Sequence, residues 1–258
     1  MLYEMGENRP LILVSNDDGY QAKGLKSLVD MVSDMGDIIV CAPDSTRSGQ
    51  SRAFTMPMPL TLNFVNEEPG KIVYRCSGTP VDCVKMAYSE VCPRRPDLLL
   101  GGINHGDNSS VNAQYSGTVG IAIEGAMRGI PSIAFSLCDF RQDADFSPMR
   151  EIVRKYVRKV LDEGLPHFSC LNINFPLTDQ YKGDRVCRMA LGHWRKEVVK
   201  REHPSGGGNY YWMSGFYQND EPDSVDTDAW ALAHGYASVT PLTADMTDRS
   251  LLEKMLHG

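Results

Sequence analysis

Short apolar runs alternate with amphipathic segments along the first two thirds of the chain. Leu11 to Val14 are four apolar residues in succession, which is typical of a short strand buried on both faces. In residues 24–34 the apolar positions recur with the period of one helix face. The same pattern predicts strands over residues 11–15, 38–42, 98–102, 130–136 and 171–175, an extended pair over 60–65 and 71–76, and helices over 24–34, 81–90, 115–128 and 149–163.

This alternation predicts an α/β fold, a Rossmann-like three-layer sandwich whose mostly parallel sheet has helices on both faces. At 258 residues the chain can bury a large core as one domain, residues 1–258. The pattern changes after residue 176, where strand-like segments at 185–191 and 209–216 flank a glycine-rich turn. A short helix after residue 227, a strand over 236–241 and a helix over 249–256 follow. We therefore expect residues 177–258 to add a β-hairpin and a C-terminal arm.

Three neighbouring aromatic residues, Tyr210, Tyr211 and Trp212, lie in this last part of the chain. Large aromatic side chains are costly to leave in water, so they should be covered. They pack either in the core or against a second copy of the chain, and we favour the second copy.

Composition narrows the classes of protein. The chain has 26 Lys and Arg against 33 Asp and Glu, a net charge of −7, which argues against a stable nucleic-acid partner. Its seven cysteines are scattered without a CxxC pair, so we expect reduced, buried thiols. Residues 1–10 are polar and resemble no signal peptide, and no apolar stretch approaches the ~20 residues of a membrane helix. We expect a cytoplasmic protein without a membrane partner.

Candidate chemistry gathers after the predicted parallel strands, whose carboxyl ends meet at one edge of the sheet. Asp17 and Asp18 follow the first strand, Ser48 lies in the loop after the second, and Asn104 and Asn108 follow the third. Carboxylate, hydroxyl and amide oxygens suit a hard divalent cation such as Mg²⁺ or Mn²⁺. The alternative is that the two aspartates only form an Asx-turn and cap the next helix.

A phosphate group would also fit this edge. Ser116, Gly117 and Thr118 open a predicted helix, where N–H donors and the two hydroxyls are available to phosphate oxygens. Neighbouring residues have two interpretations each. His105 is a general acid or base, or a bystander. We expect Asp82 to cap its helix. Arg47 either pairs with phosphate or is merely solvated.

Several other phosphate and nucleophile motifs are absent from the sequence. It contains no GxxxxGK[ST], no GxGxxG after the first strand and no GxSxG. Catalysis by a metal-bound water fits what remains.

Taken together, the motifs resemble the SurE family, the stationary-phase survival proteins. The matching segments, in family order between residues 11 and 242, are ILVSNDDGYQAKGL, CAPDSTRSGQS, CSGTPVDCV, PDLLLGGINHGDN, YSGTVGIAIEGAMRGIPSIAFS, LNINFP, YYW and HGYASVTPL. The resemblance implies a metal-dependent 5′/3′-nucleotidase. It also implies a homodimer or homotetramer in which the hairpin and the C-terminal arm are exchanged between subunits.

The resemblance assigns roles to the residues gathered above. It implies that one divalent metal per subunit is held by Asp17, Asp18, Ser48 and Asn104, with the two aspartates as the catalytic pair. It places Asn108 and the turn of Ser116, Gly117 and Thr118 beside the substrate phosphate.

One segment departs from the family pattern. Many relatives read GINxGxNxG followed by an acidic pair, whereas here Ser110 replaces the last glycine and Val111-Asn112 replace the acids. The departure concerns the shape of this loop and the preference among nucleotides. It leaves Asn104 untouched.

We therefore expect hydrolysis of nucleoside 5′- and 3′-monophosphates to nucleoside and phosphate, with polyphosphate as a further substrate. Two alternatives stay open. The chain could be a non-catalytic sensor of nucleotide or metal, or a phosphatase that forms an aspartyl-phosphate on Asp17 or Asp18.

Overall fold

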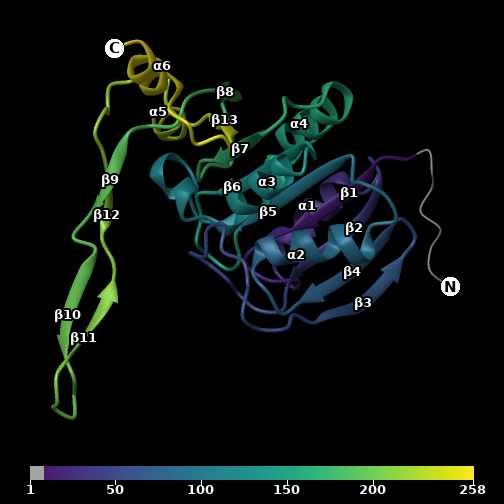
Figure 1. Ribbon diagram of the computed structural model, residues 1–258, viewed down its shortest axis with the longest axis horizontal. Helices are drawn as coiled ribbons and strands as arrows, with labels where there is room; N and C mark the ends of the chain where they lie inside the picture. The colour runs from purple at the N-terminus through teal and green to yellow at the C-terminus, as the bar shows by residue number, and fades with distance from the viewer. Residues whose placement is uncertain (1–8) are drawn as a thin grey trace.

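The structure is a computed structural model and describes residues 9–258 (Figure 1). A nine-stranded sheet forms its centre, in the order β3-β4-β2-β1-β5-β6-β7-β13-β8. Neighbours from β4 to β7 run parallel, whereas β3 and β13 are antiparallel to β4 and β7, so the expected mostly parallel sheet is confirmed. The strands are β1 Leu11–Ser15, β2 Asp37–Pro43, β3 Leu62–Glu68, β4 Lys71–Cys76, β5 Leu98–His105, β6 Ser132–Leu137, β7 Ser169–Phe175, β8 Asp184–Val186 and β13 Ala237–Thr243.

Helices cover both faces of the sheet, as expected. Strand β1 shows why, because Ile12 and Val14 join one apolar cluster while Leu11 and Leu13 join another on the opposite face. The first cluster contains the apolar sides of α1 and α4, and the faces covered by α2 and α3 are packed in the other clusters. The helical segments are α1 Lys23–Val32, α2 Pro80–Met86, η1 Ala87–Val91, η2 Ser110–Gln114, α3 Gly117–Met127, η3 Ser147–Met149 and α4 Arg150–Glu163.

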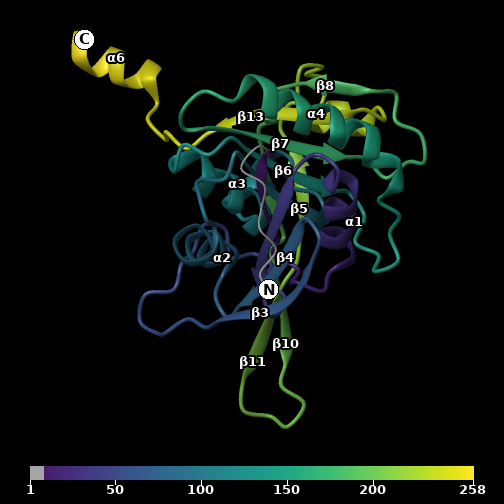
Figure 2. The same cartoon turned by 90° about the vertical axis from the view of Figure 1, so that its right-hand side faces the viewer.

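The C-terminal part forms an arm and also completes the sheet. Strand β9 (Gly192–Arg195) pairs with β12 (Phe216–Asn219), and β10 (Val198–Glu202) pairs with β11 (Asn209–Met213). The resulting hairpin stands away from the body in both views (Figures 1 and 2). After α5 (Asp228–Ala233) the chain returns through β13 between β7 and β8, so residues beyond 177 also build the sheet.

The final helix, α6 (Arg249–His257), projects from the body in Figure 2. None of its residues is buried. The aromatic residues on β11 are exposed as well, at 60% for Tyr211 and 63% for Trp212, so the core does not cover them.

Several boundaries differ from those expected. Strand β5 continues past the glycine pair to His105, because its pairing with β6 resumes after an irregularity at Gly101–Asn104. The strand expected over 185–191 is wrong in extent, since β8 ends at Val186 and β9 begins only at Gly192. Helix α3 begins at Gly117 because Ser116 is its N-cap.

Other expectations concern cysteines and membranes. All seven cysteines are free thiols, and five of them are buried. Within residues 9–258 no helix is long and apolar enough to cross a bilayer. The expectation about a signal peptide rests mainly on residues 1–8, which lie outside the described part of the chain.

Candidate active site at the carboxyl edge of the sheet

The turn after β1 frees both aspartates from a capping role. Asn16 closes this turn, because its side chain accepts the Gly19 N–H at 3.2 Å and donates to the Gly19 carbonyl at 3.0 Å. Helix α1 has Ala22 at its N-cap and no side-chain capping bond. The Asx-turn and cap alternative for Asp17 and Asp18 is therefore wrong.

Asp17 is held in a closely packed, buried position. Its side chain is 3% exposed, and the Thr118 hydroxyl donates to Oδ1 at 2.5 Å. Burial, with a smaller contribution from the neighbouring Asp18 carboxylate, raises the pKa of Asp17 to about 6, although the Thr118 hydrogen bond acts in the opposite direction. Burial also raises the pKa of Asp18. The backbone N–H of His105, which donates to Asp18 Oδ2 at 3.4 Å, partly offsets this rise. Two adjacent carboxyls whose charge is poorly solvated form a site that favours a cation.

The N-terminus of α3 abuts Asp17. A Cβ atom on Gly117 would lie 2.9 Å from Asp17 Cβ and 3.0 Å from its Oδ2, so only glycine permits this approach. The Ser116 hydroxyl accepts the Val119 N–H at 3.1 Å, and the Thr118 hydroxyl is committed to Asp17. The donors left at this end are the Ser116 O–H and the first backbone N–H groups of the helix, which have no partner within it.

The loop that contains Ser48 is fixed on both sides of that residue. The Arg47 N–H donates to the Asp17 carbonyl at 2.7 Å, and the Ser51 N–H donates to the Tyr115 carbonyl at 3.0 Å. Ser48 itself is exposed, and its hydroxyl has no hydrogen-bond partner within the described residues. The Arg47 bond therefore brings the backbone of this loop to Asp17, and the lone pairs of the Ser48 hydroxyl are free.

Arg47 and Asp82 support this loop. The Arg47 guanidinium donates to the Ser77 carbonyl at 3.0 Å and lies 3.5 Å from Asp44, so it is not merely solvated. Its pairing with phosphate stays a prediction. Asp82 caps α2, as expected, and in addition accepts the N–H and hydroxyl of Thr55 at the end of the loop.

The end of β5 supplies the amide side chains. Asn104 donates through Nδ2 to the Gly106 carbonyl at 3.0 Å, which leaves Oδ1 as an oxygen ligand. Asn108 is 6% exposed and donates through Nδ2 to the Ser136 hydroxyl at 2.8 Å. Its backbone is held by β7, with N–H to Asn174 Oδ1 and C=O to Asn172 Nδ2, both at 2.9 Å.

His105 follows Asn104, and its ring packs edge-on against Phe146, the residue before η3, with 5.0 Å between centroids. Its Nδ1 is buried and unbonded among the described residues.

The donor set fits a hard divalent cation. Asp17, Asp18, Ser48 and Asn104 offer two carboxylates, a hydroxyl and an amide oxygen, all of which suit Mg²⁺ or Mn²⁺. Within residues 9–258 no group of three or more His, Cys, Asp and Glu side chains could hold a metal. The site therefore depends on the neutral oxygens as well as the aspartates.

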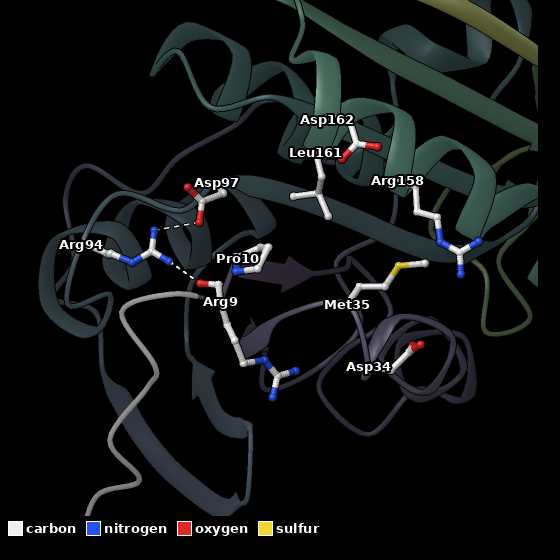
Figure 3. A pocket seen from close by; sticks show the side chains of 9 residues that line it. All are labelled: Arg9, Pro10, Asp34, Met35, Arg94, Asp97, Arg158, Leu161 and Asp162. Carbon is white, nitrogen blue, oxygen red and sulfur yellow. Dashed lines mark hydrogen bonds and ion pairs between the residues drawn. The ribbon is translucent and has the colours of Figure 1, made fainter.

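A separate cavity of about 710 Å³ lies at the opposite edge of the sheet, where the parallel strands begin (Figure 3). The Arg94 guanidinium, which lines this cavity, is paired with the Asp97 carboxylate at 2.7 Å and donates to the Arg9 carbonyl at 2.7 Å. These contacts fix the chain as it enters β1, and nothing in the cavity resembles the donor set above.

The sequence alone did not single out Asn172 and Asn174. They alternate with apolar residues in β7 and are buried, at 2% and 0% exposure. The alternation of LNINF was the available signal, because a buried strand with two amides on one face must bond them to something.

The fold and these residues define an α/β protein with a cluster of oxygen and N–H groups at the carboxyl edge of its sheet. The family model described as survival protein SurE matches residues 12–196, and the chain belongs to this family. It is 51% identical over 251 residues to the 5′-nucleotidase SurE of Phocaeicola vulgatus, covering 97% of each chain. It is 47% identical to that of Bacteroides thetaiotaomicron, covering 97% of this chain and 96% of the relative.

A solved structure shows the same fold. The crystal structure of the SurE protein from Aquifex aeolicus matches with a TM-score of 0.81 at 35% identity, covering 95% of this chain and 98% of that one. The expected family is therefore confirmed, and the expected enzyme class agrees with the names of the relatives.

Proposed function

We propose that this chain is a divalent-metal-dependent nucleotidase that hydrolyses nucleoside 5′- and 3′-monophosphates. The observation that carries the proposal is the buried Asp17 carboxyl, beside Asp18, against the N-terminus of α3. It supports the proposal because oxygen atoms that could bind one cation lie next to N–H groups that could donate to a phosphate group. The names of the relatives support 5′-nucleotidase activity, and the 3′ activity and polyphosphate hydrolysis are our extension.

Four residues would hold one Mg²⁺ or Mn²⁺ per subunit: Asp17, Asp18, Ser48 and Asn104. The cation, when bound, polarises a phosphoryl oxygen and lowers the pKa of a bound water. The Thr118 hydroxyl and the Arg47 N–H fix the side chain and backbone of Asp17, so the ligand pair is oriented before substrate binds.

The phosphate would be held by the backbone of Ser116, Gly117 and Thr118 and by Asn108. The Thr118 hydroxyl already donates to Asp17, whereas the Ser116 hydroxyl accepts a bond and keeps its own O–H, so that O–H and the N–H groups at the start of α3 are the donors. Asn108 uses Nδ2 to reach Ser136 and retains a second N–H on the same nitrogen. These donors would stabilise charge on the transferring phosphoryl group.

The direct test is phosphate release from 5′-AMP and 3′-AMP, with EDTA and after adding back Mg²⁺ or Mn²⁺. We expect loss of turnover with EDTA and recovery with metal. Asp17→Asn should lower kcat by about 1,000-fold or more, because it removes a charged ligand. Asp34→Asn, which changes a surface carboxylate paired with Arg154, is the matched control and should keep full activity.

Three outcomes would contradict the proposal. Turnover that persists in EDTA would show that the activity does not depend on a metal. A phospho-enzyme trapped by acid quench would favour the aspartyl-phosphate mechanism. Binding of AMP without turnover under every metal condition would favour a sensor.

We also propose that residues 1–258 form one domain whose residues 177–258 carry a hairpin and an arm that join subunits into a homodimer or homotetramer. Exposed apolar side chains on both elements support this assembly. On α6 they recur on one face at positions 251, 252, 255 and 256, with exposures of 51%, 42%, 76% and 65%.

A further inference from the structure

The loop between Asn104 and Ser116 is bonded to the base of the hairpin by side chains outside the proposed metal and phosphate site. We propose that Tyr217 on β12 and Trp194 on β9, together with the buried Asp228 of α5, are positioning residues that hold this loop for phosphate binding. The inference rests on the proposed function, because it assigns these residues to the same site.

Ser110 is the centre of the first connection. It is 1% exposed and has a φ of 50°, a left-handed backbone that a non-glycine residue adopts only with support. Its N–H donates to Asp228 Oδ2 at 2.8 Å, and its hydroxyl donates to the Ala190 carbonyl at 2.8 Å. The Tyr217 hydroxyl lies 2.5 Å from the same Ser110 oxygen.

Asp228 joins three segments of the chain. Besides Ser110, its carboxylate accepts the N–H groups of Ala190 at 2.9 Å and of Ala229 at 2.8 Å. The side chain is 0% exposed, so these N–H groups replace the water it has lost. Asp228 thus fixes the loop relative to the segment that leads into β9.

Trp194 and Asn112 make the second connection. The indole Nε1 donates to Asn112 Oδ1 at 2.8 Å. Asn112 Nδ2 lies 3.4 Å from Asp107 Oδ2, and Asp107 Oδ1 accepts the Ser109 N–H at 2.7 Å. The connection therefore reaches both residues that flank Asn108 in the chain.

Asn108 is consequently held from two directions. Strand β7 holds its backbone through Asn172 and Asn174, and the hairpin base holds the residues that follow it. Ser110 and Asn112 are two of the positions that depart from the family pattern. A glycine at position 110 could not make the hydroxyl contacts, so in this chain the departure adds a connection to the hairpin.

The test compares Tyr217→Phe, Ser110→Gly and the double variant in the full-length, metal-loaded protein. Hydrogen exchange of residues 107–114 without substrate reports the loop, and KM for AMP with kcat reports the site. Each single variant should speed exchange at the Ser110 amide about three- to tenfold and raise KM by a similar factor, with a smaller change in kcat. The double variant should be no worse than Ser110→Gly, since Ser110→Gly already removes the contact that Tyr217→Phe removes, together with the bond to Ala190.

Controls separate positioning from general stability. Tyr156→Phe removes a tyrosine hydroxyl bond of similar length, 2.6 Å, to the Asp184 carboxylate at the start of β8. It should lower the melting temperature without changing loop exchange or KM. Trp194→Phe keeps the ring but removes the bond to Asn112, and it gives a second test if Tyr217→Phe does not fold.

Two results would overturn the inference. Additive effects of Ser110→Gly and Tyr217→Phe would show that the two residues act separately. Faster loop exchange with an unchanged KM would show that the connection is structural only. If the wild type has no nucleotidase activity at all, the proposed function fails, and the exchange data still report whether the connection exists.

Discussion

The carboxyl edge of the sheet and the hairpin arm differ in whether their energetically unfavourable groups have partners within the chain. At the edge, the Asp17 carboxyl is 3% exposed and is bonded by Thr118 from a segment about a hundred residues away. On the arm, Trp212 and Met213 are 63% and 75% exposed. The chain supplies partners for its buried charges but leaves these apolar groups in water. The comparison indicates that contacts within one chain bring the groups of the edge together, whereas the proposed assembly would cover the arm with a second chain.

Among the changes that test this comparison, we expect disturbing the packing of the edge to lower activity the most. In Gly117→Ala the new methyl group would lie 2.9 Å from Asp17 Cβ and 3.1 Å from Pro80 Cγ, so the helix or the aspartate must move. A displacement approaching 1 Å at a catalytic group costs about 100-fold in rate, and we expect kcat for AMP to fall by about that factor. Steady-state kinetics with saturating metal measures it.

Gly125→Ala is the matched control for this change. Gly125 lies further along the same helix and is also crowded, against the Ser132 hydroxyl and Leu99. It should lower the melting temperature while kcat of the folded fraction stays near wild type. Equal losses of kcat in both variants would mean that the Gly117 effect is one of stability alone.

The sequence predicts contacts between residues that are close in the chain, but not contacts between distant ones. The apolar run of β1 and the adjacent Asp17 and Asp18 were visible because strand periodicity and adjacency are local. The hydrogen bond from Asn108 to Asn174 spans 66 residues, and that from Ser110 to Asp228 spans 118. Such bonds depend on how the strands are ordered in the sheet, and sequence spacing carries no signal for that order.

The same limit explains the errors in the C-terminal part. The strand over 236–241 was expected, but its place between β7 and β8, antiparallel to β7, was not. Alternation of apolar residues predicts that a strand is half-buried without saying which neighbour it pairs with. Ser48 was identified because the RSG segment is a compact loop motif, whereas Asp228 sits in an ordinary helix start.

A second prediction concerns the arm. The double variant Trp212→Ser/Met213→Ser removes the exposed apolar groups of β11, and we expect it to weaken self-association by about 30-fold or more, as for residues central to an interface. Light scattering after size exclusion, over a range of concentrations, gives the mass. Phe64→Ser, which changes a ring that is 54% exposed on β3, is the control and should leave the mass unchanged. A wild-type protein that is monomeric at every concentration would contradict the proposed assembly.

The last prediction concerns the contribution of Asp17 to the dependence of stability on pH. Burial raises the pKa of Asp17 from 3.8 to about 6, so the folded protein binds this proton more tightly than the unfolded chain does. The contribution of Asp17 is therefore most favourable below about pH 4 and is lost as the pH rises to about 6, a change of ~3 kcal/mol. Other carboxylates in the molecule have lowered pKa values and act in the opposite direction, so the wild-type curve alone is ambiguous.

Comparing wild type with Asp17→Asn isolates this term. In metal-free protein, the variant should gain stability over wild type as the pH rises from 4 to 7, by up to ~3 kcal/mol, because asparagine has no proton to lose. Urea unfolding at each pH measures the difference. Adding Mg²⁺ or Mn²⁺ should remove the gain, since a cation stabilises the ionised carboxylate of the wild type only. Parallel stability curves for the two proteins, with and without metal, would show that ionising Asp17 costs no stability. That result would contradict the view that the edge, unlike the exposed arm, buries a costly charge.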